Sequence, residues 1–428
     1  MASTSDWSRH RQNLAVQASL VRGYSALTAA LLDAAVTWLG DPEAAGHSLG
    51  DVEGVRLACE RIATLLDADQ ADGGETGWIN DLDPALRLNA VLHWFVLQDD
   101  PRVAELRPYY KTVAEGEGPG AKDPRDHDFA AHLLRAVTAL GSDLFELAAG
   151  WRVITNESSR GLAWLLPAVL LEVEAAHLIE FGCNAGLNLY AEQRRFDLAW
   201  SAQERLRIGK GKRDQFLILC RGEQPEGLGE FTKAMRVGPE ILSRVGGDSS
   251  PFDLDVEGAD ARLEASVWGD QRRRLDRLRE AIDIHERART DESLARARVE
   301  GLSLPDEVQD FLAAAIPAQP EAPVITYNTY VTAYLSDVNQ RACARSIRDF
   351  AKEWSMRHKL PWMWVRFEPS RPGQAPAPHA GWCRWVVELF DGPHNQRIEL
   401  GWAHPYLVRA EFGPGLRELR SLADRKPE

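Results

Sequence analysis

The sequence predicts an α/β protein: a mainly parallel sheet closed by an antiparallel hairpin and preceded by an all-helical N-terminal domain. Three observations support this prediction. Apolar residues recur at helical spacing through the first 150 residues. Strand-sized apolar runs alternate with helical patterns after Trp151, and two apolar runs near the C-terminus flank the turn Asp391-Gly392-Pro393. At about 100–200 residues per domain, 428 residues suffice for two or three domains.

Composition is that of an ordinary globular protein and narrows the expected partners. The chain is 44% hydrophobic and 27% charged, and 64 acidic against 50 basic side chains give a formal net charge of −14. Because this charge repels phosphate backbones, we do not expect nucleic acid as a partner. The first 12 residues lack the apolar core of a signal peptide, and no apolar run is long enough to span a bilayer.

The five cysteines are too scattered for a zinc knuckle or a disulfide framework; they are Cys59, Cys183, Cys220, Cys343 and Cys383. We therefore expect a cytoplasmic protein with no membrane contact and no bound metal. Its oligomeric state is left open.

The helical domain is expected over residues 1–150. From Leu14 to Leu39, apolar side chains fall on one helix face. Three further helical stretches are separated by loops rich in Gly, Asp and Pro, namely Val52–Leu66, Pro84–Leu97 and Phe129–Ala149.

The α/β domain is expected over residues 151–428. Its strand-sized runs are His177–Phe181, Pro323–Tyr327, Pro361–Phe367, Trp382–Phe390 and Arg397–Leu400, of which the last two form the hairpin. Residues 194–245 are charged and irregular, and we interpret them as an insertion. Because this insertion is long for a structureless loop, it should be partly folded.

The most informative segment is a glycine turn that follows the strand ending at Phe181. Gly182 and Gly186 bracket the turn, and a helix is expected to begin there, so a ligand can approach the backbone and the amides of a helix N-terminus. Glu180 stands on the strand tip. Dinucleotide-binding folds place their acid roughly 20 residues after the turn. A carboxylate beside the turn suits a cationic ligand instead, which favours S-adenosylmethionine over NAD. The alternative is a tight strand–helix turn with a surface glutamate.

A second acid, at the end of the next strand, should bind ribose hydroxyls. Asp197 lies at a suitable distance along the chain, but its neighbours do not look like a strand. Asp248 follows a short apolar approach and precedes the turn Ser249-Ser250-Pro251, so we prefer it. Its structural alternative is an aspartate that only caps a turn.

Four blocks in order resemble a bacterial family, the one numbered domain of unknown function 2332. They are Thr155-Asn156-Glu157-Ser158-Ser159-Arg160, the segment Glu180–Leu189, Asp248–Pro251 and Val267–Leu275. The core of that family resembles class I S-adenosylmethionine-dependent methyltransferases, which implies a Rossmann-like sheet and this cofactor. The resemblance assigns the cofactor to Glu180, Gly182, Asn184, Gly186 and Asn188. Here Ile154 replaces the usual glutamine, and Cys183 and Asn184 replace alanine and serine.

The first block gives a further prediction for the cofactor site. If Thr155 or Asn156 caps a helix running through Leu171, Glu157 and Arg160 lie one turn apart on it. That helix would cover the methionine end of the cofactor, with Arg160 pairing its carboxylate. The alternative is a capped helix with an internal ion pair.

Substrate and catalytic candidates come from later segments. Trp268 and Asp270 open a highly charged helix, Gln271–Arg289, and are predicted to line the substrate pocket together with Tyr334. Ligands in open α/β sheets bind beyond the carboxyl ends of the strands, so Asn328 and Tyr330 are expected at the transfer site. His404 is the remaining candidate base, and Glu368 a further titratable group. Leu302 stands where related enzymes carry an adenine-binding aspartate.

The sequence thus favours an S-adenosylmethionine-dependent methyltransferase that acts on a small molecule, with the helical domain as lid or substrate selector. The rival hypothesis is a ligand-binding or sensor protein without catalysis, suggested by Asn184 and Leu302. A third and weaker one is an NAD-type dehydrogenase.

Overall fold

The computed structural model describes residues 4–70, 83–114, 122–153, 157–213, 216–227, 236–370 and 376–423. The chain divides into two compact units. Unit 1 comprises Met1–Thr155 and Asp255–Leu275, and unit 2 comprises Asn156–Leu254 and Asp276–Glu428. None of the described helices combines the length and apolarity needed to cross a bilayer.

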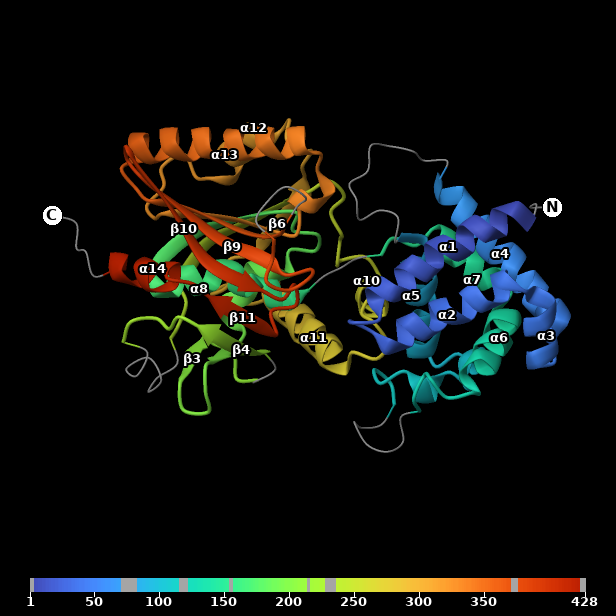
Figure 1. The fold of residues 1–428 in the computed structure, drawn as a ribbon. Coiled ribbons are helices and arrows are strands. Elements are labelled where there is room, and N and C mark those ends of the chain that lie inside the picture. Colours follow the sequence, from blue (N-terminus) through green and yellow to red (C-terminus); the bar gives the residue numbers. More distant parts are fainter. Residues whose placement is uncertain are drawn as a thin grey trace. The chain divides into compact units, whose positions relative to one another are not determined.

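Unit 1 is helical (Figure 1), as expected from its apolar spacing. Its α-helices are α1 (Thr4–Val21), α2 (Ala26–Gly40), α3 (Pro42–Leu49), α4 (Val52–Gln70), α5 (Asp83–Leu97), α6 (Phe129–Leu140), α7 (Ser142–Ala149) and α10 (Ala259–Ala265), with the 3₁₀ turns η2 (Pro101–Val103) and η3 (Arg107–Tyr109). The pattern from Leu14 to Leu39 is two helices, because Ser25 caps α2 by accepting from the Thr28 amide. Gly141, at φ +56°, divides the stretch Phe129–Ala149.

The predicted domain boundaries assigned the segment Asp255–Leu275 to the α/β domain, but in the structure it belongs to unit 1. It packs with the N-terminal helices, and Ala265 lies in their apolar core. Asp270 accepts hydrogen bonds from the Ser25 hydroxyl at 2.8 Å and from the Leu27 amide at 3.1 Å. A carboxylate on the first amides of a helix satisfies donors that have no partner within the helix, which explains why the segment returns to unit 1.

Unit 2 is built on an 11-stranded mixed sheet in the order β3-β2-β4-β11-β10-β9-β8-β7-β1-β5-β6. The strands are β1 (Ala175–Phe181), β2 (Phe196–Ala199), β3 (Arg205–Ile208), β4 (Phe216–Gly222), β5 (Glu240–Asp248), β6 (Ala297–Gly301), β7 (Val324–Thr329), β8 (Trp362–Pro369), β9 (Cys383–Asp391), β10 (His394–Ala403) and β11 (Arg409–Phe412). From β6 to β8 all pairs are parallel, and β8, β9, β10 and β11 then pair antiparallel. The structure is therefore α/β, with the expected C-terminal hairpin.

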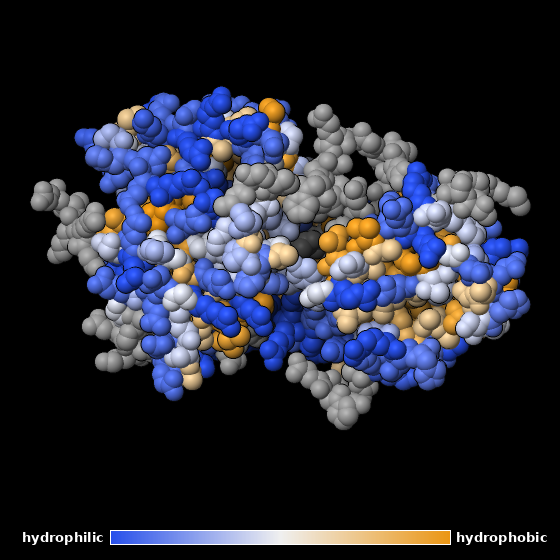
Figure 2. Space-filling view, in the orientation of Figure 1, coloured by the Kyte–Doolittle hydropathy of each residue, from blue (hydrophilic) through white to orange (hydrophobic). Residues whose placement is uncertain are grey.

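Helices cover both faces of this sheet (Figure 1). The α-helices are α8 (Leu162–Leu170), α11 (Arg272–Arg287, in unit 2 from Asp276), α12 (Val308–Ala315), α13 (Asp337–His358) and α14 (Gly415–Ala423), with the 3₁₀ turns η4 (Ser158–Gly161), η5 (Leu187–Gln193) and η6 (Thr332–Tyr334). One apolar core lies between α12, α13 and the sheet, and another between α8, α14 and the opposite face. The outer surface over α12 and α13 is mainly hydrophilic (Figure 2), as expected for helices that bury one face.

The expected insertion at 194–245 is wrong in one respect, because Glu240–Val245 belongs to β5. Its other described residues include β2, β3 and β4, which extend the opposite end of the sheet because β4 pairs with β11, β2 with β4 and β3 with β2. Asp197 lies in β2, although its neighbours did not look like a strand, and it pairs there with Arg195 at 2.7 Å. Strand formation here depends on the partner β4, which short-range patterns do not reveal.

Candidate functional site

The strand order of unit 2 contains a topological switch point between β1 and β7. Apart from β2, β3 and β4, which lie at the far end of the sheet, the chain runs from β1 outward through β5 to β6, and then returns to β7 and β8 on the other side of β1. In open α/β sheets, ligands bind in the crevice beyond the carboxyl ends of the strands at such a point. The glycine turn follows β1, and the segment from Tyr330 to Thr332 follows β7, so both lie at this edge.

The glycine turn has the backbone conformations that its sequence predicts. Gly182, Asn184 and Gly186 have φ values of +73°, +53° and +71°, and glycine and asparagine tolerate this left-handed region best. Asp248, at the tip of β5, accepts a hydrogen bond from the Asn184 amide at 2.9 Å and another from the Ser250 amide at 2.9 Å. This neighbouring strand makes Asp248, and not Asp197, the acid beside the turn.

The prediction of an α-helix directly after the turn is wrong. The segment η5 is a 3₁₀ helix, interrupted by non-helical backbone at Tyr190. It is held by a buried ion pair between Glu192 and Arg244 at 2.6 Å and by the Tyr190 hydroxyl, which accepts from the Ala297 amide. These tertiary contacts replace a regular α-helix, so the turn has no α-helix N-terminus above it.

Side chains of the protein itself pack against the glycines of the turn. A Cβ on Gly182 would lie 2.2 Å from Val331 Cγ2, and one on Gly186 would lie 2.9 Å from Val299 Cγ2. On β5, a Cβ on Gly246 would lie 2.5 Å from Cys183 Sγ. The glycines therefore permit close packing within unit 2 as well as the turn itself.

Glu180 is 1% exposed, and its Oε2 has no hydrogen-bond partner among the described residues. Burial raises its pKa to about 8; the neighbouring Tyr327 hydroxyl opposes this shift, the charge of Asp248 adds to it, and Arg194 and Arg160 oppose it. Glu180 is therefore a buried acid that is mostly protonated at neutral pH, and not the surface glutamate of the alternative interpretation.

The described part of the first sequence block, Glu157–Arg160, forms a polar cluster on the α8 side of the sheet. Glu157 caps η4 by accepting from the Ser159 amide. Arg160 does not pair with Glu157; it donates to the Pro405 carbonyl at 3.1 Å and lies 4.7 Å from the Tyr330 ring centroid. The predicted helix through Leu171 is thus replaced by η4 followed by α8. Thr155 and Asn156 lie outside the described residues.

Asn188 joins η4 to η5. Its Oδ1 accepts from the Gly161 amide at 3.0 Å, and its Nδ2 donates to the Glu157 carbonyl at 3.2 Å. Arg194, fully buried, donates to the carbonyls of Ser158 and Leu187 and reinforces the same junction. Burial lowers its pKa to about 10. Both ends of the Asn188 amide are thus used in structural contacts.

Asn328 pairs in register with Phe181, so its side chain lies on the opposite face of the sheet from that of Glu180. Its Nδ2 donates to Glu368 Oε1 at 2.6 Å, and its Oδ1 accepts from Trp364 Nε1 at 2.9 Å. Glu368 also accepts from the amides of Val331 and Thr332 and from the Thr332 hydroxyl. Burial raises the pKa of Glu368. This carboxyl group thereby fixes the segment after β7, in which Tyr330 has a φ of +64°.

The other predicted residues are distributed over the chain. Tyr334 is 47% exposed in η6, and His404 is half-buried, with its Nδ1 accepting from the Tyr406 amide. Trp268 and Asp270 belong to unit 1, where Trp268 packs edge-on against Tyr24 and Asp270 caps α2. Leu302 is buried beside Gly247.

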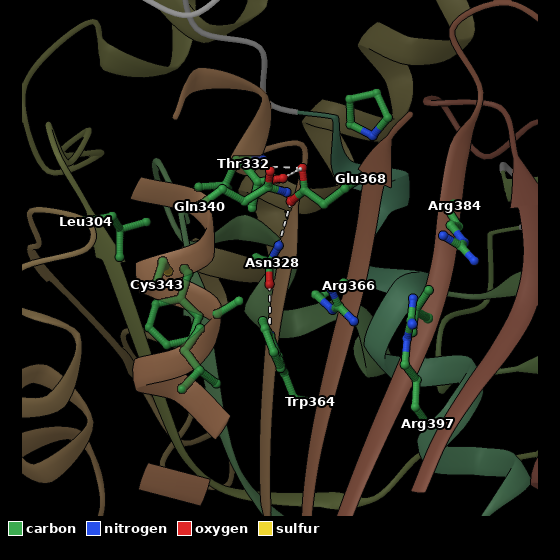
Figure 3. Close-up of a pocket in the computed structure, with 16 residues that line it drawn as sticks. Leu304, Asn328, Thr332, Gln340, Cys343, Trp364, Arg366, Glu368, Arg384 and Arg397 are labelled. Atoms are coloured by element: carbon green, nitrogen blue, oxygen red, sulfur yellow. Dashed lines mark hydrogen bonds between the residues drawn. The ribbon is translucent and has the colours of Figure 1, made fainter. Parts of the chain in front are cut away.

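A cavity of about 100 Å³ opens beside Asn328, between α13 and the sheet (Figure 3). Three arginines that line it were not among the predicted site residues; they are Arg366, Arg384 and Arg397, from β8, β9 and β10. The alternation of these arginines with apolar residues along each strand could have indicated that they share one face of the sheet. The sequence could not indicate which strands would be neighbours. In the described part of the chain, no three His, Cys, Asp or Glu side chains gather as a metal site would require.

The chain is thus an α/β protein with a large mixed sheet and a topological switch point of the kind at which open α/β sheets bind ligands. The chain belongs to the family described as "Uncharacterized protein conserved in bacteria (DUF2332)", whose model matches residues 55–410. The resemblance in the sequence blocks is thereby confirmed at the level of this family. Neither a curated protein nor a solved structure matches the chain.

Proposed function

We propose that this protein is an S-adenosylmethionine-dependent methyltransferase acting on a small molecule. The observation that carries the proposal is the arrangement at the switch point: a glycine turn after β1, with the carboxylate of Asp248 at the tip of the adjacent β5 bonded to the turn at Asn184. The order β6-β5-β1-β7-β8 corresponds to the first five strands of the doubly wound order 3-2-1-4-5-6, which supports a nucleotide-type ligand at this point.

The residues present fit such a cofactor in two respects. A carboxylate offers about four acceptor positions, so Asp248 can accept from a ribose hydroxyl beside the backbone amides of Asn184 and Ser250. The Oδ1 of Asn184 is buried and has no partner among the described residues, so it offers a further acceptor within the turn. In one respect access is restricted, because the Val331 side chain fills the space over Gly182.

The protein's part in the reaction would be orientation. The cofactor, when bound, supplies an activated methyl group. Glu368 and Asn328 fix the backbone after β7, and Tyr330 and Val331 present their side chains at the same edge. Aligning a nucleophile and excluding water lower the barrier without a dedicated base. Asn328, which also lines the cavity described above, is proposed to stand on the acceptor side.

Replacing Asp248 by asparagine tests the cofactor site. Hydrogen bonds to a charged group contribute about 1.5–3 kcal/mol, so D248N should weaken binding of S-adenosylmethionine roughly tenfold or more. Isothermal titration of the full chain measures this. The matched control is D197N, the same change at the other candidate acid, which lies in β2 and should leave the affinity unchanged. Equal losses in both variants, or no binding by the unmodified protein at millimolar concentration, would refute the proposal.

The second candidate function is ligand binding without catalysis. It is favoured by the packing of Val331 and Val299 against the glycines and by the use of both Asp248 oxygens in backbone hydrogen bonds. Binding of S-adenosylmethionine that is sensitive to D248N, without methyl transfer to any component of a cell extract, would support it over the enzyme.

A further inference from the structure

The cavity beside Asn328 has two chemically different sides. Phe181, Leu304 and Ile347 give it an apolar side toward β1, α12 and α13. The guanidinium groups of Arg366, Arg384 and Arg397 lie on the other side, on three neighbouring strands (Figure 3). A volume of about 100 Å³ is enough for several waters or a small organic molecule.

Positive charge is in excess on the polar side. Arg366 and Arg348 both pair with Glu388, and Arg384 pairs with Glu399. Arg397, exposed at the cavity, lies opposite Glu388 on the neighbouring strand and is attracted by its charge, but it makes no hydrogen bond or ion pair with any residue that the structure describes. One guanidinium is therefore left over in a chain whose formal net charge is −14.

The one carboxylate that lines the cavity does not supply the missing partner. Glu368 already accepts from Asn328, Val331 and Thr332 at distances between 2.6 and 3.1 Å. The Nε atoms of Arg366 and Arg384 are also buried without a hydrogen-bond partner in the described residues. Buried polar groups are normally satisfied, so donors left over around a cavity point to an acceptor-rich ligand.

We propose that this cavity binds a small organic anion, with a carboxylate or phosphate group held by Arg384 and Arg397 and an apolar body against Ile347, Trp364 and Val386, which line the cavity nearer these arginines. Arginine is the side chain best suited to hold planar or tetrahedral oxyanions through paired hydrogen bonds. The apolar side restricts the ligand to one with a hydrocarbon part.

The proposal deepens the proposed function and, in its assignment of the anion as methyl acceptor, rests on it. Val331 lines the cavity and also fills the space above Gly182, so a single side chain separates the cavity from the glycine turn. An acceptor in the cavity would therefore lie next to the predicted cofactor. Binding of the anion itself can be measured without the cofactor.

The test is isothermal titration of the full chain with butanoate, butyl phosphate, inorganic phosphate and the neutral butanamide. Both organic anions should bind at least tenfold more tightly than butanamide, because each charge-assisted hydrogen bond contributes about 1.5–3 kcal/mol. The ratio of the two anions identifies the headgroup, and weaker binding of inorganic phosphate is expected because it lacks the apolar part. Equal binding of butanamide would overturn the proposal. So would the absence of binding of either anion at about 20 mM, a concentration about a hundred times the Kd of a weak site.

Variants localise the binding. R397Q removes a guanidinium without breaking any ion pair in the described part of the chain. The variant should therefore fold normally and bind the two organic anions about tenfold more weakly. R345Q is the matched control, since Arg345 is exposed on α13 and does not line the cavity. A344L fills the cavity and keeps every arginine, so it should also abolish binding. Equal loss in R397Q and R345Q would show general surface attraction and refute the site.

These outcomes separate the two proposals. Retained anion binding with no response to S-adenosylmethionine would leave the cavity site standing and refute the methyltransferase. Cofactor binding sensitive to D248N, with no anion bound, would refute the cavity site alone.

Discussion

The Glu180→Gln variant should be more stable than the unmodified protein at pH 8, and the two should converge near pH 4.5. Burial raises the pKa of Glu180 from 4.5 to about 8, so the folded state holds its proton more tightly than the unfolded chain does. The contribution of Glu180 to the free energy of unfolding is therefore fully present below pH 4.5, and it is lost as the pH rises toward 8. At about 1.4 kcal/mol per pH unit, the difference in free energy of unfolding reaches about 5 kcal/mol.

Urea-induced unfolding at several pH values between 4.5 and 8 measures this difference. Glu388 gives a control of opposite sign. Burial raises its pKa, but the hydrogen bonds from Arg348 and the charge of Arg366 outweigh burial and lower it overall. Its stabilising effect is therefore present above the ordinary pKa of 4.5 and fades at lower pH, so E388Q should be the less stable variant at neutral pH. Parallel pH profiles for the unmodified protein and E180Q would contradict the assignment.

The same acid distinguishes a structural from a ligand-binding role. A cationic ammonium placed against Glu180 would favour the ionised form, so binding of S-adenosylmethionine at pH 7 would release a proton. Titration in two buffers of different ionisation enthalpy detects such a release, and E180Q should abolish it. If no proton is released, Glu180 is part of the core and Asp248 alone holds the ligand.

Replacing Gly182 by alanine should destabilise unit 2 by about 3 kcal/mol, because an alanine there has both a strained backbone and a steric conflict. The backbone has a φ of +73°, and the new Cβ would lie 2.2 Å from Val331 Cγ2. Urea-induced unfolding measures the loss in the free energy of unfolding. A change smaller than that of the control below would be inconsistent with the packing observed over the turn.

Gly392 provides the control for the backbone cost alone. It also has positive φ, at +57°, but a Cβ there would have no neighbour within 4 Å. G392A should therefore cost about 1 kcal/mol. In a double-mutant cycle, V331A should restore part of the stability lost in G182A, because it removes the steric conflict and leaves the backbone strain. Additive effects of G182A and V331A would show that the two residues do not interact.

Much of unit 2 was predictable because the relevant signals are local. The apolar runs gave β1, β7, β8, β9 and β10 to within a few residues, and the turn Asp391-Gly392-Pro393 gave the hairpin. The left-handed backbone at Gly182, Asn184 and Gly186 was likewise readable from residue type. The position of Asp248 beside β1 followed from its place at the end of the next strand.

What local patterns missed was decided by contacts between distant segments. Strand β4 pairs with β11, almost two hundred residues later, and this pairing turns the expected insertion into one end of the sheet. The segment η5 is not an α-helix because Glu192 and Arg244 hold it in another form. Asp270, expected in a substrate pocket, instead caps α2 in unit 1.

The sequence by itself determined the α/β class, the helical N-terminal part, the family and the glycine turn, because residue type and periodicity act over a few residues. Only the tertiary structure decided that Glu180 and Asn328 face opposite sides of the sheet, that Val331 lies over Gly182, and that three arginines share one cavity. The physical reason is that burial, pKa and charge balance depend on which strands become neighbours. That neighbourhood is set by packing of the whole unit.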